Sequence, residues 1–406
     1  MKKNILIIGA GGVAHVAAHK CAQHNDILGH ICIASRTISK CHKIIESVHR
    51  KDHLKDKSKK LYARQIDALD TRQVIDVIRD TNSEIVLNLG SAFLNMSVLD
   101  ACIETGTTYI DTAIYEDPEK VCEEPPWYEN YEWKKRDICK EKGINAILGI
   151  GFDPGLVNAY CAYAQKHLFD EIKMIDIMDV NVGSHGKYFA TNFDPEINLR
   201  EFIKVWSWIG GEWKEYPVHT VKRSYNFPEV GMQTVYLNGH DEIHSLSSNF
   251  NVENIRFWMG FSDHYINVFT VLKNIGLTSH LPVTLEDGKK VIPLKLLKAL
   301  LPDPMSLAPK YTGKTCIGNL IQGTYENQGR EVFIYNVCDH QKCYEEVESQ
   351  AISYTAGVPA VAASILVAKG VWDPKTMVNV EELDPDPIIE FLDSIGFKTE
   401  IREHGA

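Results

Sequence analysis

Short apolar runs alternate with helical patterns along residues 1–150 of the chain. Runs of strand length lie at residues 5–8, 31–34, 61–66, 84–89, 107–111 and 145–148. Between the first two runs, Val13, Val16 and Cys21 recur at the spacing of one helix face. Thr71 stands where the cap of a later helix is expected. Strands that alternate with helices are typical of βαβ units, so the pattern predicts an α/β fold with a Rossmann-type, doubly wound parallel sheet.

The pattern changes after residue 150. Segments rich in aromatic and β-branched residues lie at 173–181, 206–213, 216–221, 233–237, 256–261 and 332–338, and helical patterns at 156–168, 265–275, 294–301 and 360–369. This composition predicts a second, α+β domain over residues 151–352 with a largely antiparallel sheet. We expect residues 353–406 to pack back on the first domain.

A glycine-rich turn joins the first predicted strand to the first predicted helix. Gly9, Gly11 and Ala14 occupy the spaced small-residue positions of the dinucleotide fingerprint, and Gly12 and Val13 complete the turn. The phosphates of a dinucleotide would accept hydrogen bonds from the free N–H groups of the helix N-terminus. A purely structural glycine turn is the alternative, but the strand before it and the helix after it favour cofactor binding.

The end of the second predicted strand indicates which dinucleotide is bound. An NAD-specific fold normally places an acidic residue here, but this chain has Ser35, Arg36 and Thr37. Serine and arginine are suited to a 2′-phosphate, so the sequence predicts NADPH as the cofactor. At the end of the fourth predicted strand, three more candidates border the nicotinamide ribose: Asn88, Gly90 and Ser91.

Length and charge narrow the class of protein. The chain has 406 residues, which exceeds one ordinary core, and its 44% hydrophobic and 24% charged residues are typical of a globular protein. The formal net charge of −11 argues against a nucleic-acid partner and suits a cationic substrate.

The ten cysteines are scattered and lack the paired spacing of zinc sites. Cys338, His340 and Cys343 are close in sequence but have no second ligand pair, so we expect no metal. Reduced thiols, an early first strand and the lack of an apolar run near about 20 residues predict a cytoplasmic protein without a signal peptide or membrane span.

Polar residues gather at three further places. Tyr109 and Asp111 lie at the carboxyl end of a predicted strand, where cofactor and substrate meet in doubly wound sheets. Residues 149–158 form a loop with few side chains before a helix. Residues 181–202 are dense in polar side chains and are interpreted as a ligand-facing loop.

The chain resembles the saccharopine dehydrogenase family in five blocks. These are GAGGVA (9–14), ASRT (34–37), GFDPGLVN (151–158), NVGSHGKYFATNFDPEINLREF (181–202) and SYTAGVPA (353–360). Within the family it is most similar to the carboxynorspermidine/carboxyspermidine dehydrogenases of polyamine biosynthesis. The resemblance implies NADPH-dependent reductive condensation of L-aspartate β-semialdehyde with putrescine or 1,3-diaminopropane, giving carboxyspermidine or carboxynorspermidine. It also implies a homodimer.

The implied reaction forms an imine, which then accepts a hydride. A group must move protons during the loss of water, and the candidates are Asp111, Asp153 and His185.

The substrate ends need groups of opposite charge. The aminocarboxylate end needs a guanidinium, for which Arg200 and Arg256 are candidates, and the far ammonium needs a carboxylate, for which Glu201 or Asp194 could serve. Further candidate substrate-binding residues are Tyr109, Asn192 and Asn198. A structural salt bridge is the alternative role for each charged residue.

Two other functions remain open. A saccharopine or other opine-type dehydrogenase would act on a 2-oxoacid and an amino acid, and would need a second carboxylate-binding arginine. A non-catalytic NADPH-sensing protein would keep the fold without the chemistry, although the dense polar block at 181–202 argues against it.

Overall fold

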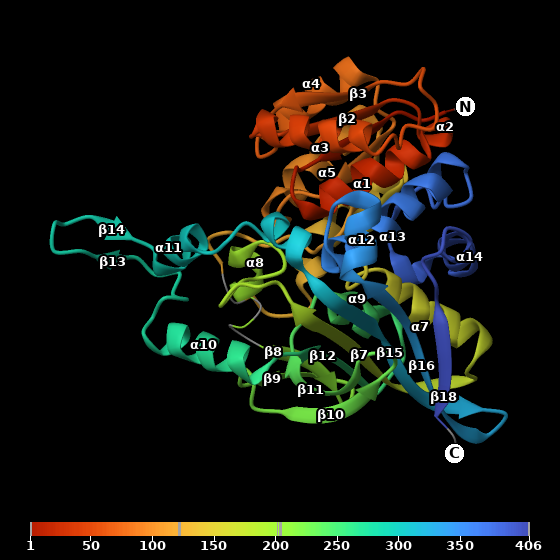
Figure 1. The fold of residues 1–406 in the computed structure, drawn as a ribbon. Coiled ribbons are helices and arrows are strands. Elements are labelled where there is room, and N and C mark those ends of the chain that lie inside the picture. Colours follow the sequence, from red (N-terminus) through yellow and green to blue (C-terminus); the bar gives the residue numbers. More distant parts are fainter. Residues whose placement is uncertain (1, 121–122, 201, 203–204, 405–406) are drawn as a thin grey trace.

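The first domain is a seven-stranded, wholly parallel sheet in the order β17-β6-β5-β4-β1-β2-β3 (Figure 1). The computed structural model describes residues 2–120, 123–200, 202 and 205–404. The strands are β1 (Ile5–Ile8), β2 (Ile31–Ser35), β3 (Leu61–Gln65), β4 (Ile85–Asn88), β5 (Thr108–Asp111), β6 (Ala146–Leu148) and β17 (Met377–Asn379). The predicted Rossmann-type sheet is confirmed, and β1 and β4 flank its topological switch point.

Helices cover both faces of this sheet, which is why its strands read as continuous apolar runs. They are α1 (Gly12–Gln23), α2 (Asn25–Leu28), α3 (Ile38–Arg50), α4 (Thr71–Thr81), α5 (Asn95–Thr105) and α6 (Arg136–Lys142), with 3₁₀ turns at Ala92–Leu94, Trp127–Asn130 and Glu132–Lys135. The prediction that Thr71 caps α4 was wrong by one residue. The cap is Asp70, whose side chain accepts a hydrogen bond from the Arg72 N–H.

The second domain is built on a nine-stranded sheet, drawn below the first in Figure 1. Its path is β10-β11-β12-β7-β15-β16-β18, with β8 paired to β12 and β9. The strands are β7 (Glu171–Ser184), β8 (Val205–Ile209), β9 (Trp213–Tyr216), β10 (Lys222–Phe227), β11 (Gly231–Asn238), β12 (Asn254–Gly260), β15 (Thr312–Tyr325), β16 (Gln328–Asp339) and β18 (Glu400–His404). Among the described strands of this second sheet, only β7 and β12 pair in parallel, so the predicted, largely antiparallel sheet is confirmed.

Two predicted segments of this sheet differ from the structure. Residues 206–213 form the end of β8, a turn and the start of β9, because Gly210 and Gly211 reverse the chain with positive φ. Residues 216–221 were predicted as a strand, but this was wrong. Tyr216 ends β9, and residues 217–221 form a turn in which Thr220 donates through its backbone and its hydroxyl to the Pro217 carbonyl.

The remaining helices of the second domain lie on and beside its sheet. They are α7 (Leu156–His167), α8 (Pro195–Arg200), α9 (Glu242–Asn249), α12 (His340–Val347) and α14 (Asp386–Ser394). A projecting arm consists of α10 (Asp263–Asn274), the hairpin β13 (Val283–Thr284) and β14 (Lys290–Val291), and α11 (Pro293–Leu300), as Figure 1 shows. A 3₁₀ turn over Pro304–Lys310 leads from the arm back to the body.

The C-terminal segment contributes to both domains. Helix α13 (Ala351–Ala368) lies against α1, and β17 joins the first sheet beside β6 before a 3₁₀ turn at Val380–Glu382. β18 then pairs with β16 in the second sheet. Helix α13 starts nine residues before the predicted 360 and is apolar and long enough to cross a membrane, but 78% of it is buried inside the protein. It is therefore a core helix, and one apolar cluster runs from the first sheet through α13 to Ile175 and Ile177 of β7.

Candidate active site

The glycine-rich turn has a geometry that only small residues allow. Gly9 has φ +113°, and a Cβ atom there would lie 2.6 Å from the carbonyl oxygen of Leu89. Gly11 is the N-cap of α1, and a Cβ atom there would meet open space. Gly12, Val13 and Ala14 form the start of the helix, and no side chain caps its first N–H groups. The helix N-terminus is therefore free to donate to the phosphates of a dinucleotide, which fits the predicted cofactor.

The end of β2 supplies the candidate contacts to the adenosine ribose. The Ser35 hydroxyl accepts the Thr37 N–H at 3.3 Å, and the backbone carbonyl of Arg36 accepts from Gln65 at 3.1 Å. Arg36 and Thr37 are exposed. Within the described part of the chain, no carboxylate forms an ion pair with the Arg36 guanidinium. A 2′-phosphate could therefore bind this guanidinium without displacing another partner.

At the end of β4, Asn88 shapes the turn toward the switch point. Its side chain is buried, donates to the Asn95 side chain at 2.9 Å and accepts the Gly90 N–H at 3.3 Å. Gly90 and Ser91 follow directly at the carboxyl edge of the sheet. Tyr109 is completely buried, and its hydroxyl lies 3.4 Å from the Asn88 amide. The structure therefore places Tyr109 in the core and does not bring it to a substrate surface.

Asp111 lies at the carboxyl end of β5 and holds the loop that follows β6. Its Oδ1 accepts the Gly149 N–H at 2.6 Å, and its backbone carbonyl accepts the Ile150 N–H at 2.8 Å. Burial raises the pKa of the Asp111 carboxyl from 3.8 to about 7, although the Gly149 hydrogen bond partly offsets this. With 1% of its surface exposed, Asp111 is suited to positioning the loop that carries Asp153.

Asp111→Asn is expected to make stability less dependent on pH. A carboxyl whose folded pKa is raised from 3.8 to about 7 stabilises the fold only in its protonated form, so its contribution is lost as pH rises through 7. The asparagine variant lacks this loss and should gain about 2.5 kcal/mol relative to wild type between pH 5 and pH 8, since part of the loss in wild type has already occurred at pH 5. Urea unfolding at both pH values tests this; equal differences between the two proteins at pH 5 and pH 8 would contradict it.

Asp153 is a half-buried residue at the junction of the two sheets. Burial, followed by the nearby charge of Asp179, raises its pKa well above the usual range, whereas the charge of His240 opposes this and Glu242 reinforces it. Burial likewise raises the pKa of Asp179 to about 7. Asp153 and Asp179 therefore release their protons at a higher pH than isolated carboxyls do.

The segment between β11 and α9 is the part of the second domain that contacts the first domain at this junction. The Asp241 side chain accepts the Ile114 N–H of the first domain at 2.8 Å, and burial raises its pKa to about 6. The His240 ring stacks on Phe257 with 4.1 Å between ring centroids, and His240 Nδ1 contacts Glu242 Oε2 at 2.6 Å.

Sequence reasoning missed Asp179, His240, Asp241 and Glu242. For the last three, the signal was the polar run Asn238-Gly239-His240-Asp241-Glu242 directly after an apolar strand. Asp179 had no comparable signal, because it lies inside a strand whose burial depends on its neighbours.

His185 lies beyond the end of β7, beside a second polar group. Its Nδ1 accepts the Lys187 N–H at 3.1 Å, and its ring lies edge-on to Tyr311 at 5.5 Å. The Tyr311 ring stacks on His340, and its hydroxyl donates to Asn192 at 2.8 Å. His185 and Asn192 are thus brought together by their shared contact with Tyr311, near the end of β7 that follows Asp179.

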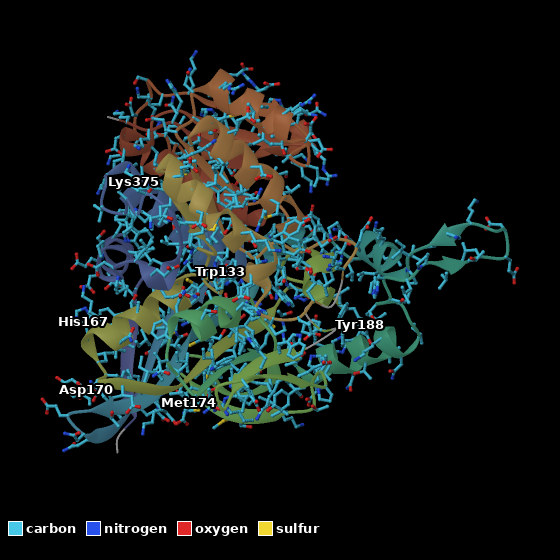
Figure 2. All side chains as sticks on the ribbon, turned by 180° about the vertical axis from the view of Figure 1, so that it is seen from behind. Trp133, His167, Asp170, Met174, Tyr188 and Lys375 are labelled. Atoms are coloured by element: carbon cyan, nitrogen blue, oxygen red, sulfur yellow. The ribbon has the colours of Figure 1, made fainter. Side chains whose placement is uncertain are left out.

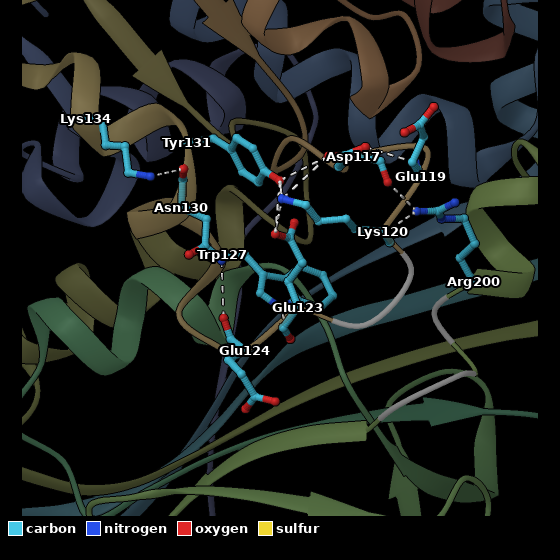
Figure 3. A network of polar contacts seen from close by, with 10 residues as sticks. All are labelled: Asp117, Glu119, Lys120, Glu123, Glu124, Trp127, Asn130, Tyr131, Lys134 and Arg200. Carbon is cyan, nitrogen blue, oxygen red and sulfur yellow. Dashed lines mark hydrogen bonds and ion pairs between the residues drawn. The ribbon is translucent and has the colours of Figure 1, made fainter.

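Arg200 is held by the loop that leads away from β5 (Figure 3). It donates to the Glu116 carboxylate at 2.7 Å and to the backbone carbonyls of Asp117 at 2.9 Å and Lys120 at 3.0 Å. Burial raises the pKa of Glu116 to about 7, while the Arg200 charge opposes the rise. This arrangement gives Arg200 a structural role in joining α8 to the first domain.

The other predicted substrate residues are dispersed. Arg256 pairs with Asp176 at 2.6 and 2.8 Å on the sheet face that carries Trp258, opposite to the face of Phe257 and Asp179. The structure therefore does not bring Arg256 to the junction. Asn198 is buried and accepts from the Tyr265 hydroxyl at 3.3 Å. Glu201 lies outside the described residues, and Asp194 pairs with Lys298 at 2.9 Å.

Comparisons with known proteins cover nearly the whole chain. Residues 5–147 match the family model of the saccharopine dehydrogenase NADP binding domain, and residues 151–397 match that of the saccharopine dehydrogenase C-terminal domain. A carboxynorspermidine synthase of Vibrio alginolyticus is 50% identical over 98% of this chain and 97% of its own length. A carboxynorspermidine synthase of Vibrio cholerae is 48% identical over the same shares.

A more distant relative and one solved structure extend the comparison. A carboxyaminopropylagmatine dehydrogenase of Synechocystis sp. is 41% identical over 97% of this chain and 96% of its own length. The structure of apo saccharopine dehydrogenase (L-Glu forming) from Saccharomyces cerevisiae has a TM-score of 0.72, covers 99% of this chain and 100% of its own, and is 13% identical. At that identity the structural likeness concerns the fold alone.

Proposed function

The chain belongs to the saccharopine dehydrogenase family, and we propose that it is an NADPH-dependent oxidoreductase that condenses an aldehyde with a diamine. The aldehyde is L-aspartate β-semialdehyde, the diamine is putrescine or 1,3-diaminopropane, and the product is carboxyspermidine or carboxynorspermidine. Relatives named carboxynorspermidine synthase, 48% to 50% identical over nearly the full length, support this activity in polyamine biosynthesis.

The observation that carries the proposal is the group of carboxyls at the junction of the two sheets. Asp153, Asp179, Asp241 and Glu242 face a single imidazole there, and no lysine or arginine within the described ranges forms an ion pair with them. Such a site favours a substrate that carries positive charge. It lies beside the carboxyl edge of the parallel sheet, where dinucleotide-dependent enzymes of this architecture bind substrate.

The chain's residues account for the proton transfers. The amine adds to the aldehyde, and the resulting carbinolamine loses water when an acid protonates its hydroxyl, which leaves a protonated carbon–nitrogen double bond. Asp153 is suited to that role because it lies at the junction and burial raises the pKa of its carboxyl, which favours the protonated form. Asp111 positions the Asp153 loop through Gly149. When bound, NADPH supplies the hydride that reduces the double bond.

We also propose that the protein is cytoplasmic and forms a homodimer. Nine cysteines in the described part of the chain are buried, free thiols, which a reducing compartment preserves. The arm exposes large apolar side chains: Val271, Ile275, Leu281 and Leu300. Tyr188, exposed over 79% of its surface, lies on the side from which the arm projects (Figure 2). Cover from a second copy would remove these groups from water.

An assay of NADPH absorbance tests the proposed reaction. Oxidation of NADPH is expected only when L-aspartate β-semialdehyde and a diamine are both present. Turnover with a 2-oxoacid and an amino acid would indicate an opine-type dehydrogenase instead, and cofactor binding without turnover would indicate a sensor. Arg200 and Arg256 are both engaged by the chain's own carboxylates, which disfavours the opine-type alternative.

A further inference from the structure

Three polar side chains at the junction carry atoms without a hydrogen-bond partner among the described residues. These atoms are Oδ1 of Asp179, Oε1 of Glu242, and both Oδ1 and Nδ2 of Asn238. Glu242 is 1% exposed and Asn238 is not exposed at all. A buried polar atom without a partner costs about 1–3 kcal/mol, so three such groups in one place require a reason.

Strand register places these groups on one face of the second sheet. Asn238 of β11 pairs directly with Phe257 of β12, which in turn pairs with Ile177 of β7. Side chains of paired residues share a face, and Asp179 returns to that face two residues after Ile177. His240 stacks on Phe257 and thereby lies over the same face.

Glu242 joins the group from the start of α9. His240 Nδ1 contacts its Oε2 at 2.6 Å, which leaves Oε1 as the free oxygen. Asp179 forms no ion pair with any residue in the described ranges, and its pKa is raised by burial and by the charge of Glu242. The free oxygens of Asp179, Glu242 and Asn238 are three hydrogen-bond acceptors, and a cation bound among them would favour the ionised form of the carboxyls.

An ammonium group matches this arrangement. It carries one positive charge and three N–H donors, which equals the number of free acceptor oxygens. A guanidinium is planar and has five donors in a fixed fork, so it matches three acceptors from three different elements less well. A neutral ligand would leave the carboxyl groups without a counter-charge.

We propose that Asp179, Glu242 and Asn238 bind the remote ammonium of the diamine, the end that does not react with the aldehyde. This inference rests on the proposed function for the choice of ligand. Of the two candidates that the sequence offered for this role, Asp194 is paired with Lys298, and Glu201 lies outside the described residues. Asp153, whose pKa the charge of Asp179 helps to raise, then stands next to this subsite on the loop that Asp111 holds.

Calorimetric titration of amines into the NADP⁺-loaded protein tests the subsite directly. The probes are 1,3-diaminopropane and putrescine, each compared with propylamine or butylamine, which lack the remote ammonium. Asp179→Asn and Glu242→Gln are each expected to weaken diamine binding about 30-fold, the effect of losing one charge-assisted hydrogen bond, and to leave monoamine binding unchanged. Asn238→Leu removes an acceptor without changing the charge and should weaken diamine binding about 5-fold.

Glu253→Gln is the matched control, because Glu253 is an exposed carboxylate of the same domain and should bind diamines as wild type does. NADPH binding by each variant verifies that it is folded. Diamine affinities within 2-fold of wild type in all three subsite variants would overturn the proposal. Diamine binding tests the subsite alone. NADPH oxidation, assayed on the same preparations with both co-substrates, tests the proposed function separately.

Discussion

Asp153→Asn is expected to lower kcat by about 100-fold at pH 7 while leaving NADPH affinity near that of wild type. Asparagine keeps the shape of the side chain but cannot donate the proton that the departing water requires. Asp153 lies at the junction, and burial together with the charge of Asp179 raises the pKa of its carboxyl, which favours the protonated form that acts as the acid. Stopped-flow measurement of NADPH oxidation under saturating substrates separates this step from substrate binding.

Two comparisons make the Asp153 result specific. Asp76→Asn changes an exposed carboxyl on α4 and should leave kcat within 2-fold of wild type. Wild-type kcat should fall as the acid is titrated at high pH, whereas the residual rate of Asp153→Asn should be independent of that ionisation. A variant that retains full rate and the wild-type pH profile would assign the proton transfer to another group, with His185 the next candidate.

Arg36→Ala is expected to raise the KM for NADPH by about 50-fold and to change the KM for NADH by less than about 2-fold. The difference arises because only NADPH has a 2′-phosphate, and a guanidinium bound to phosphate contributes about 1.5–3 kcal/mol. Arg36 is exposed, and in the described structure no carboxylate competes for its guanidinium, so the whole interaction is lost with the side chain. Steady-state kinetics with each cofactor measures both constants.

Arg72→Ala serves as the control for Arg36, since Arg72 is an exposed arginine of the same domain on α4. It should leave both constants unchanged. Equal increases for NADPH and NADH in Arg36→Ala would place Arg36 away from the 2′-phosphate and would leave Ser35 as the remaining contact at the end of β2.

The sequence alone was sufficient for the first domain and for the architecture of the second. Buried parallel strands and amphipathic helices leave periodic patterns over a few residues, and the glycine-rich turn depends on backbone conformations of consecutive residues, such as the positive φ of Gly9. The family resemblance, carried by whole blocks such as residues 181–202, was confirmed by the family models. Each of these features is local, so it can be read without knowing which segments meet.

Only the tertiary structure decided how the candidate site is assembled. Asp153, Asp179 and Glu242 come from a loop, a strand and a helix, and only the register of β7, β11 and β12 brings them together. The same register sends Arg256 to the opposite face, where Asp176 neutralises it. Burial, and with it the raised pKa of a carboxyl, depends on neighbours far apart in the chain. The chemistry of this junction therefore follows from the fold, whereas the identity of the cofactor follows from a short stretch of sequence.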